Sequence, residues 1–216
     1  MLSPAQLLIR LGADMHPIPP QPGRRTNVRQ GRDKRRPGLK AQETAPIAKI
    51  VSGGQTGADR AAFDWAIVNH IPHSGWCPRG RPAEDGAIPD FYRVQETVST
   101  EYVVRTERNV SESDGTVIFT IGKALTGGSK DTAAIATRLK KPWMHISKAD
   151  SINPPEELRL FIKAHQVKIL NVAGTRASKE PLIADFVKAT LRAAFSEQRG
   201  SDTSGSDTTA RKRKRA

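Results

Sequence analysis

The chain has 216 residues, of which 37% are apolar, and a formal net charge of +13. This length is enough for one substantial domain. Cys77 is the single cysteine, which excludes an intramolecular disulfide, and no apolar run reaches the roughly 18 residues that a membrane-spanning helix requires. We therefore expect a cytoplasmic protein without disulfides or membrane spans.

Basic residues are concentrated at the two ends of the chain. Residues 1–45 are rich in arginine and proline, and residues 197–216 end in the run RKRKRA. Both segments are too polar to pack, so we expect a disordered basic, Pro-rich leader and a disordered basic tail. Such segments bind nucleic acid only non-specifically, through its phosphates. The remaining residues, 46–196, are predicted to form one folded domain.

Short apolar runs alternate with longer segments of helical period in this domain. Strands are predicted at 46–52, 71–76, 92–97, 115–121, 142–147 and 167–174. Helices are predicted at 61–68, from a cap at Ser99 or Thr100 to about Ser113, at 130–140, at 154–165, and at 179–195 with Ser178 as the cap. The alternation predicts an α/β, Rossmann-like three-layer fold, with a mostly parallel sheet and helices on both faces.

Three of the predicted strands end in glycine-bearing loops that precede helices. Their sequences are SGGQTGAD (52–59), TIGKALTGGS (120–129) and NVAGTRAS (171–178). In a parallel sheet these loops emerge at one edge, and backbone N–H groups at helix N-termini bind oxyanions such as phosphate. A tight strand-to-helix turn is the alternative explanation for each loop alone. None of the loops has a P-loop ending, so hydrolysis of nucleoside triphosphates is not indicated.

Polar side chains accompany the first of these loops. Gln55 and Thr56 carry hydrogen-bonding groups within it, and Asp59 is expected as a cap or first-turn acid of the next helix. Arg60 opposes the dipole of that helix unless an acidic side chain or a ligand pairs with it. We therefore regard Arg60 as the more informative residue of the two.

Other candidates are weaker. Thr175 and Arg176 follow a strand end and are placed to bind the same anion. Arg105 and Asn109 share one face of a predicted helix, and the simpler interpretation is that this face is exposed to solvent. Five scattered histidines show no metal-ligand spacing, and no nucleophile has an evident base. The sequence therefore predicts neither a metal site nor catalytic residues.

The long segment at 77–90 is dense in proline, glycine and charge, and is predicted to be a loop. Arg79 and Arg81 within it are candidates for a lid over an anion, while a solvated charged loop is the simpler interpretation. Cys77, at its start, is expected to be a small buried group, and His145 is expected to pack inside the sheet.

Several segments carry a family resemblance. VSGGQTGADRAAFDWAI, IPHSGWCPRGRPAEDGAIP, RTERNVSESDGTVIFT, LTGGSKDTAAIA, KPWMHI and ILNVAGTRASKEP together resemble the putative molybdenum carrier family, a circularly permuted YpsA-like branch of the SLOG superfamily, over about residues 46–195. The resemblance implies a Rossmann-like fold, a homo-oligomer, and a binding edge formed by the GGQTGADR and LTGGS loops. Arg108 departs from the pattern, since family members often have tryptophan there.

Together, the loops and the resemblance predict a binding protein for a small phosphorylated ligand. The resemblance implies that this ligand is the molybdenum cofactor (molybdopterin), carried as cargo. The predicted ligand-binding residues are Gly53, Gly54, Gln55, Thr56, Gly57, Asp59, Arg60, Arg79, Arg105, Asn109, Thr126, Gly127, Gly128, Ser129, Gly174, Thr175 and Arg176.

An alternative function stays open at this point. In this alternative, the chain is a sensor or a hydrolase of the SLOG superfamily that binds a nucleotide or nucleotide-sugar. Asp59, Glu84 or Asp85 would then act as acid or base. Related SLOG hydrolases use a glutamate beside a PGGxGTxxE loop. The counterpart here, TGGSKDTA, lacks that glutamate, so we assign no catalytic role to it.

Overall fold

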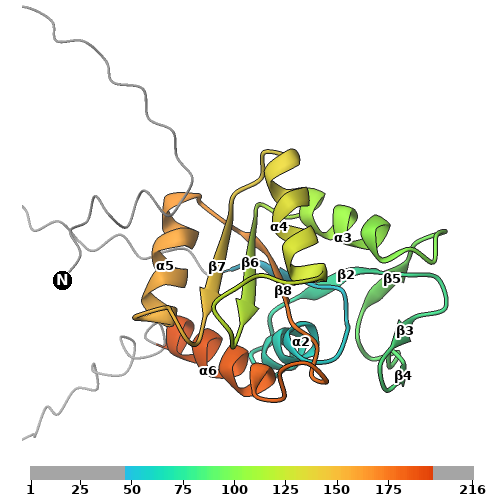
Figure 1. Ribbon diagram of the computed structural model, residues 1–216, viewed down its shortest axis with the longest axis horizontal. Coiled ribbons are helices and arrows are strands. Elements are labelled where there is room, and N and C mark those ends of the chain that lie inside the picture. The colour runs from blue at the N-terminus through green and yellow to red at the C-terminus, as the bar shows by residue number, and fades with distance from the viewer. Residues whose placement is uncertain (1–46, 197–216) are drawn as a thin grey trace, which may run out of the picture. The chain divides into compact units, whose positions relative to one another are not determined.

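The computed structural model describes residues 47–196 (Figure 1); the predicted leader at 1–45 and tail at 197–216, with their nucleic-acid contacts, lie outside this range. The strands are β1 (Lys49–Val51), β2 (His73–Cys77), β3 (Pro82–Ala83), β4 (Gly86–Ala87), β5 (Val94–Glu96), β6 (Gly115–Thr120), β7 (Trp143–Ser147) and β8 (Ile169–Gly174). The helices are α2 (Ala58–Val68), α3 (Tyr102–Ser111), α4 (Gly128–Arg138), α5 (Pro154–Ala164) and α6 (Ile183–Phe195).

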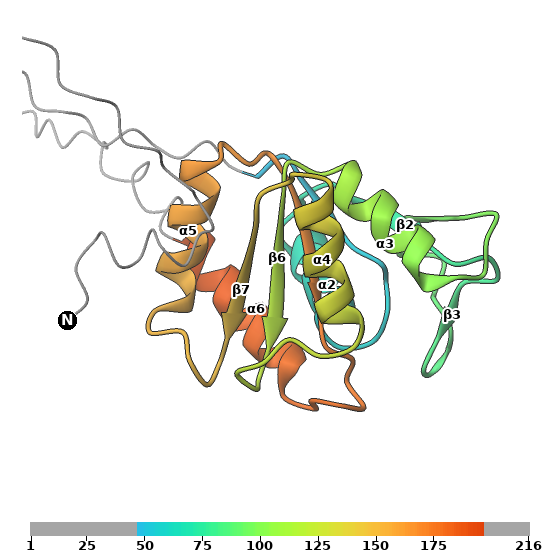
Figure 2. The ribbon, with the colours of Figure 1, turned by 45° about the horizontal axis from the view of Figure 1, so that its top comes forward.

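Six of the strands form one parallel sheet in the order β5-β2-β1-β8-β6-β7. Helix α6 contacts both α2 and α5 on one face of the sheet, and α3 packs beside α4 on the other (Figure 2). The predicted α/β three-layer fold is therefore confirmed. No helix within residues 47–196 combines the length and the apolar character needed to cross a membrane.

The two faces of the sheet are held differently. The larger core lies under α2, α5 and α6, where Phe63, Phe161 and Leu191 are essentially fully buried. The core under α3 and α4 is small, centred on Val110, Ile135 and Ala136. Because apolar burial drives packing in proportion to area, α3 needs additional attachment to the sheet.

That attachment is a buried amide on α3. Oδ1 of Asn109 accepts the backbone N–H of Trp76 at 2.8 Å, and its Nδ2 donates to the carbonyl of Trp76 at 3.1 Å. The backbone N–H and C=O of Trp76 in β2 thereby make their hydrogen bonds to a side chain of α3 rather than to a neighbouring strand. Asn109 is 98% buried, so its side chain holds α3 against the sheet without facing solvent.

Two predicted helix caps are wrong. The residue before α3 is Glu101, without a side-chain cap, and Ser99 Oγ instead accepts the N–H of Glu101. Helix α6 begins at Ile183 rather than at Lys179, because Glu180 is drawn to the backbone of the loop after β6. Residues 178–182 therefore form a turn ahead of the helix.

The long segment at 77–90 also contains more structure than predicted. β3 and β4 form an antiparallel hairpin inside it. At its start, Cys77 is fully buried, and burial raises the pKa of its thiol. The prediction of a small buried group at Cys77 is confirmed. His145 on β7 is only partly buried, with Nε2 2.7 Å from Oγ1 of Thr120.

Gly75 tests how tightly β1 and β2 approach. A Cβ at Gly75 would lie 1.8 Å from the carbonyl oxygen of Ser52, which is backbone and cannot swing away. We expect Gly75→Ala to lower the free energy of unfolding by about 3 kcal/mol or more, measured by urea denaturation. Gly128→Ala, where a Cβ meets nothing within 4 Å, is the matched control and should change it by about 1 kcal/mol at most. Equal effects would contradict the close approach.

Candidate functional site

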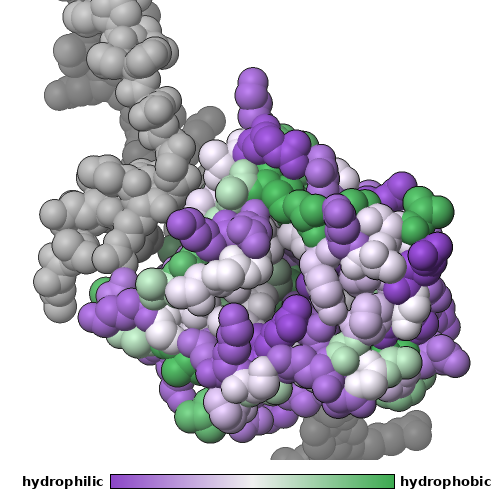
Figure 3. All heavy atoms as spheres, turned by 45° about the vertical axis from the view of Figure 1, so that its right-hand side comes forward, coloured by the Kyte–Doolittle hydropathy of each residue, from purple (hydrophilic) through white to green (hydrophobic). Residues whose placement is uncertain are grey.

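The three glycine-bearing loops lie together because β1, β8 and β6 are neighbours in the middle of the sheet. They surround a cavity of about 280 Å³ that α3 closes from the side. Its lining residues are Gln55, Asp59, Tyr102, Val103, Arg105, Thr106, Thr126, Gly128, Ser129, Asp131, Thr132, Ile135, Ala173, Gly174, Thr175, Arg176 and Lys179. Figure 3 shows the surface hollowed near its centre, with hydrophilic side chains below the hollow and at its sides and a hydrophobic strip above it.

Close backbone approach explains two of the loop glycines. Gly57 has a φ of +83°, and a Cβ there would lie 2.5 Å from the carbonyl oxygen of Thr175. The N–H of Ala58 donates to that same oxygen at 3.2 Å, so the first and third loops are joined directly. At Gly174 a Cβ would lie 2.6 Å from Cβ of Ala58. These glycines pack the loops together, and Gly57 does not line the cavity.

A buried ion pair lines the cavity. Oδ2 of Asp59, at the start of α2, lies 3.5 Å from Nη1 of Arg105 on α3. Burial raises the pKa of Asp59, while Arg105 and the backbone N–H of Gln55 oppose the rise. Asp59 is thus a first-turn acid, as predicted, and its charge is compensated from the opposite face of the sheet.

Arg105 fits beside this carboxylate because Gly53 has no side chain. A Cβ at Gly53 would lie 1.7 Å from Nη1 of Arg105. Nε of Arg105 is buried and has no hydrogen-bond partner among residues 47–196. A buried donor of this kind costs free energy until an acceptor reaches it. The site therefore contains a cationic group with unused hydrogen-bonding capacity.

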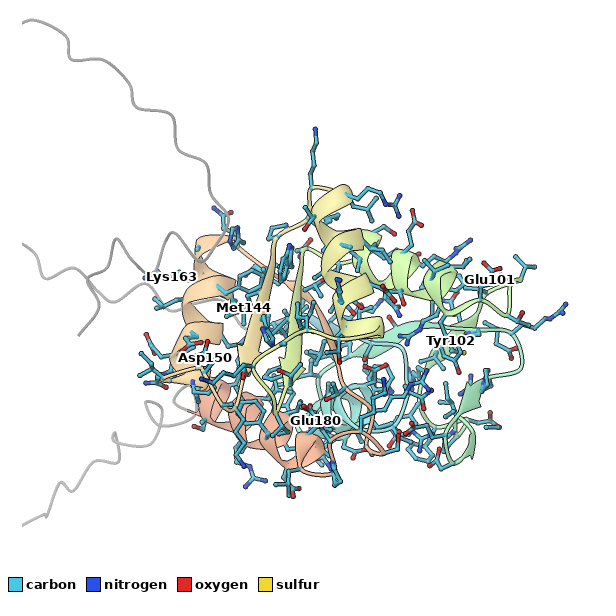
Figure 4. The ribbon with its side chains drawn as sticks, in the orientation of Figure 1. Glu101, Tyr102, Met144, Asp150, Lys163 and Glu180 are labelled. Atoms are coloured by element: carbon cyan, nitrogen blue, oxygen red, sulfur yellow. The ribbon has the colours of Figure 1, made fainter. Side chains whose placement is uncertain are left out.

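Tyr102 connects the two arginines of the site. Its ring lies 5.7 Å from the guanidinium carbon of Arg105 and 5.2 Å from that of Arg176, within the range of cation–π attraction. Figure 4 shows Tyr102 at the first turn of α3, on the side toward the loops. Together with Lys179, these side chains give the cavity three cations against the carboxylates of Asp59 and Asp131.

The structure separates the predicted ligand-binding residues into two groups. Those that line the cavity are Gln55, Asp59, Arg105, Thr126, Gly128, Ser129, Gly174, Thr175 and Arg176. Those that do not line it are Gly53, Gly54, Thr56, Gly57, Arg60, Arg79, Asn109 and Gly127.

The arginines outside the cavity have other surroundings. Arg60 pairs with both carboxylate oxygens of Asp85 and donates from Nε to the carbonyl of Gly54 at 3.2 Å. Of the two partners expected for Arg60, an acidic side chain or a ligand, the structure shows the acidic one, Asp85. Arg79 is exposed, and its backbone N–H donates to Ser99.

Some lining residues were absent from the predicted set. Tyr102 lies three residues before Arg105 on α3, and Thr106 lies one residue after it. Lys179 follows the third loop. The i, i+3 spacing of Tyr102 and Arg105 is the signal that places both on one helix face. Lys179 and Asp131 carry no comparable signal, because an exposed charge at a helix start or in a turn is ordinary.

A second carboxylate organises the loop after β6. Glu180 accepts the N–H groups of Ile121 and Gly122 at 2.7 and 2.9 Å, and also the hydroxyl of Thr175. Burial acts to raise the pKa of Glu180, but the hydrogen bonds from Thr175, Gly122 and Ile121 outweigh it, and the pKa is lowered. Glu180 therefore ties the second loop to the third (Figure 4).

No group of three or more His, Cys, Asp or Glu side chains arranged to hold a metal ion occurs within residues 47–196. The chemistry that the lining residues support is binding of an anion by arginine, lysine and hydroxyl groups. Loop N–H groups add to it where they are not already occupied.

The substitution Glu180→Gln tests whether the ionised Glu180 carboxylate links the second loop to the third, and the test uses the pH dependence of stability. A lowered pKa in the folded state contributes stability above the unfolded-state pKa, here 4.5, and this contribution is lost as the pH falls through the folded-state value. We expect the free energy of unfolding of the variant at pH 7 to be about 1–3 kcal/mol lower than that of the wild type. The difference from the wild type should shrink below pH 4.5 in urea denaturation. A pH-independent difference would contradict an ionised Glu180 as the link.

Comparison with known proteins identifies relatives with this architecture. Residues 50–195 match the circularly permutated YpsA SLOG family. The chain is also similar to a solved structure, that of the putative molybdenum carrier protein from Syntrophus aciditrophicus SB: 44% sequence identity, TM-score 0.67, with 69% of this chain and 95% of that chain covered. Among curated proteins, no match was found. The family match spans most of the chain, and the chain belongs to the circularly permutated YpsA SLOG family.

Proposed function

We propose that the cavity binds a small phosphorylated ligand and that the chain is a carrier of the molybdenum cofactor. The observation that carries the first part is the convergence of Arg105, Arg176 and Lys179 on one cavity between glycine-bearing loops. Arginine binds phosphate oxygens in a planar, bidentate geometry, and a partly desolvated site strengthens such contacts. The second part rests on the similarity to the protein from Syntrophus aciditrophicus SB.

The size and composition of the cavity support a phosphorylated ligand over an apolar one. At about 280 Å³ it lies just below the range of pockets that enclose a drug-sized ligand, about 300–1,000 Å³. A phosphate with the adjoining part of the ligand fills such a volume. The ring of Tyr102, 38% exposed beside the two arginines, offers a flat apolar surface to the remainder.

Native mass spectrometry of the freshly purified protein tests the identity of the ligand. Denaturing release followed by metal analysis is expected to yield a pterin with molybdenum or tungsten. A released nucleotide without metal would replace the carrier function by nucleotide binding. The same spectra report whether the chain assembles into a homo-oligomer, as the family resemblance implies.

Arg176→Ala tests the phosphate contact itself. We expect affinity for the released cofactor, or for inorganic phosphate as a minimal probe, to fall about 10- to 100-fold, because a charge-assisted hydrogen bond is lost. Arg79→Ala removes the same charge from an exposed position outside the cavity and is the matched control. Equal losses in calorimetric titration would show that general charge, rather than the cavity, governs binding.

Gly53→Ala tests the position of Arg105 without removing its charge. The added Cβ conflicts with the end of the Arg105 side chain and would lie 2.9 Å from Oδ2 of Asp59, so Arg105 moves away from that carboxylate. We expect phosphate affinity to fall about tenfold and the melting temperature to fall as well, because the buried carboxylate of Asp59 loses its cation. Unchanged affinity would mean that Arg105 does not bind the anion from its observed position.

A further inference from the structure

The hairpin of β3 and β4 places a carboxylate on hydroxyl groups of two binding-edge loops. Glu84, at the hairpin tip, accepts hydrogen bonds from Oγ1 of Thr56 and Oγ of Ser178. The backbone N–H of Ser178 points to the same carboxylate at 3.5 Å. Thr56 belongs to the loop after β1 and Ser178 to the loop after β8. Donors from two separate loops therefore converge on one anionic group.

These donors adjoin the cavity. Oε1 of Gln55, which lines the cavity, accepts the backbone N–H groups of both Thr56 and Glu84 at 3.0 Å. The pKa of Glu84 is lowered by its hydrogen bonds from Ser178 and Thr56 and by the charge of Arg176, which also lines the cavity. The hydroxyls of Ser178 and Thr56 lower the pKa of Glu84 more than the charge of Arg176 does. The donor group, which we call the Thr56–Ser178 cradle, thus shares Gln55 and Arg176 with the cavity.

The carboxylate in the cradle is held weakly compared with the base of its hairpin. Arg81 fixes the base, donating to the carbonyls of Ile88, Pro89, Tyr92 and Val94 at 2.9–3.2 Å. Glu84 itself is exposed, and its contacts are hydrogen bonds accessible to water. Exposed polar contacts contribute little to stability because water replaces them at small cost.

We propose that the Thr56–Ser178 cradle is a second oxyanion subsite of the ligand cavity and that the Glu84 carboxylate occupies it in competition with the ligand. The subsite takes a phosphate or carboxylate group of a ligand whose first phosphate is bound by the arginines. This inference rests on the proposed binding of a phosphorylated ligand. Glu84 is then a specificity-determining residue, since its charge disfavours ligands that carry two adjacent anionic groups.

Calorimetric titration of the full-length protein with orthophosphate and pyrophosphate tests the subsite. Glu84→Gln removes the charge and keeps the shape, so we expect pyrophosphate affinity to rise about tenfold and orthophosphate affinity to rise much less. Asp90→Asn, an equal charge change on the same segment at a fully exposed side chain, is the control and should alter neither. Thermal unfolding of each variant checks that the fold is kept.

A double variant separates the cradle from a general electrostatic effect. In Glu84→Gln combined with Thr56→Val, the gain in pyrophosphate affinity should disappear, because a donor of the cradle is removed. A gain that survives in the double variant, or no gain in Glu84→Gln, would overturn the subsite while leaving the proposed function intact if the wild type binds orthophosphate. Absence of binding of either probe to any of these proteins would overturn both.

Discussion

The ion pair of Asp59 and Arg105 is the constraint on which the binding edge depends. Asp59 begins α2 on one face of the sheet, and Arg105 lies on α3 on the other, so the pair crosses the carboxyl edge between the faces. A buried carboxylate without a cation is costly, and α3 has only a small apolar core of its own. The position of α3 is therefore set jointly by this charge and by the amide of Asn109 on Trp76.

Carboxylates of the chain also organise the loops around the cavity. Glu180 satisfies N–H groups after β6, and Glu84 satisfies hydroxyls after β1 and β8. Part of the anion-binding capacity of the edge is thus used internally, by carboxylates of the chain itself. Arg105 differs, since its Nε is the buried donor without a partner in the described part of the chain.

The sequence predicts the sheet and helices well because their patterns are local. β6 carries the apolar run Val117–Phe119 and is recovered at 115–120, and each glycine-bearing loop falls at the end of a central strand. The hairpin at 82–87 was not predicted, since two-residue strands have no alternation to detect, and the contacts of Arg81 with carbonyls of the following segment leave no pattern in the sequence.

The site was predicted less completely for the same reason. Helical spacing places Arg105 and Asn109 on one face, yet spacing does not reveal what lies opposite each residue. Arg105 lines the cavity, whereas Asn109, one helical turn later, binds the backbone of β2. Arg60 shows the reverse case: its need for an acidic partner was evident locally, while Asp85 as that partner depends on the hairpin.

The burial of Cys77 has a practical consequence for spectroscopy. The chain contains no other cysteine, and this thiol is fully buried with a raised pKa, so thiol-reactive dyes and spin labels react slowly with the native protein. A cysteine introduced at Val98, 89% exposed in the segment just before α3, is then labelled selectively without replacing the natural residue. Fluorescence or electron-spin reporters can thus be placed in the segment that leads into α3 on an otherwise unaltered background.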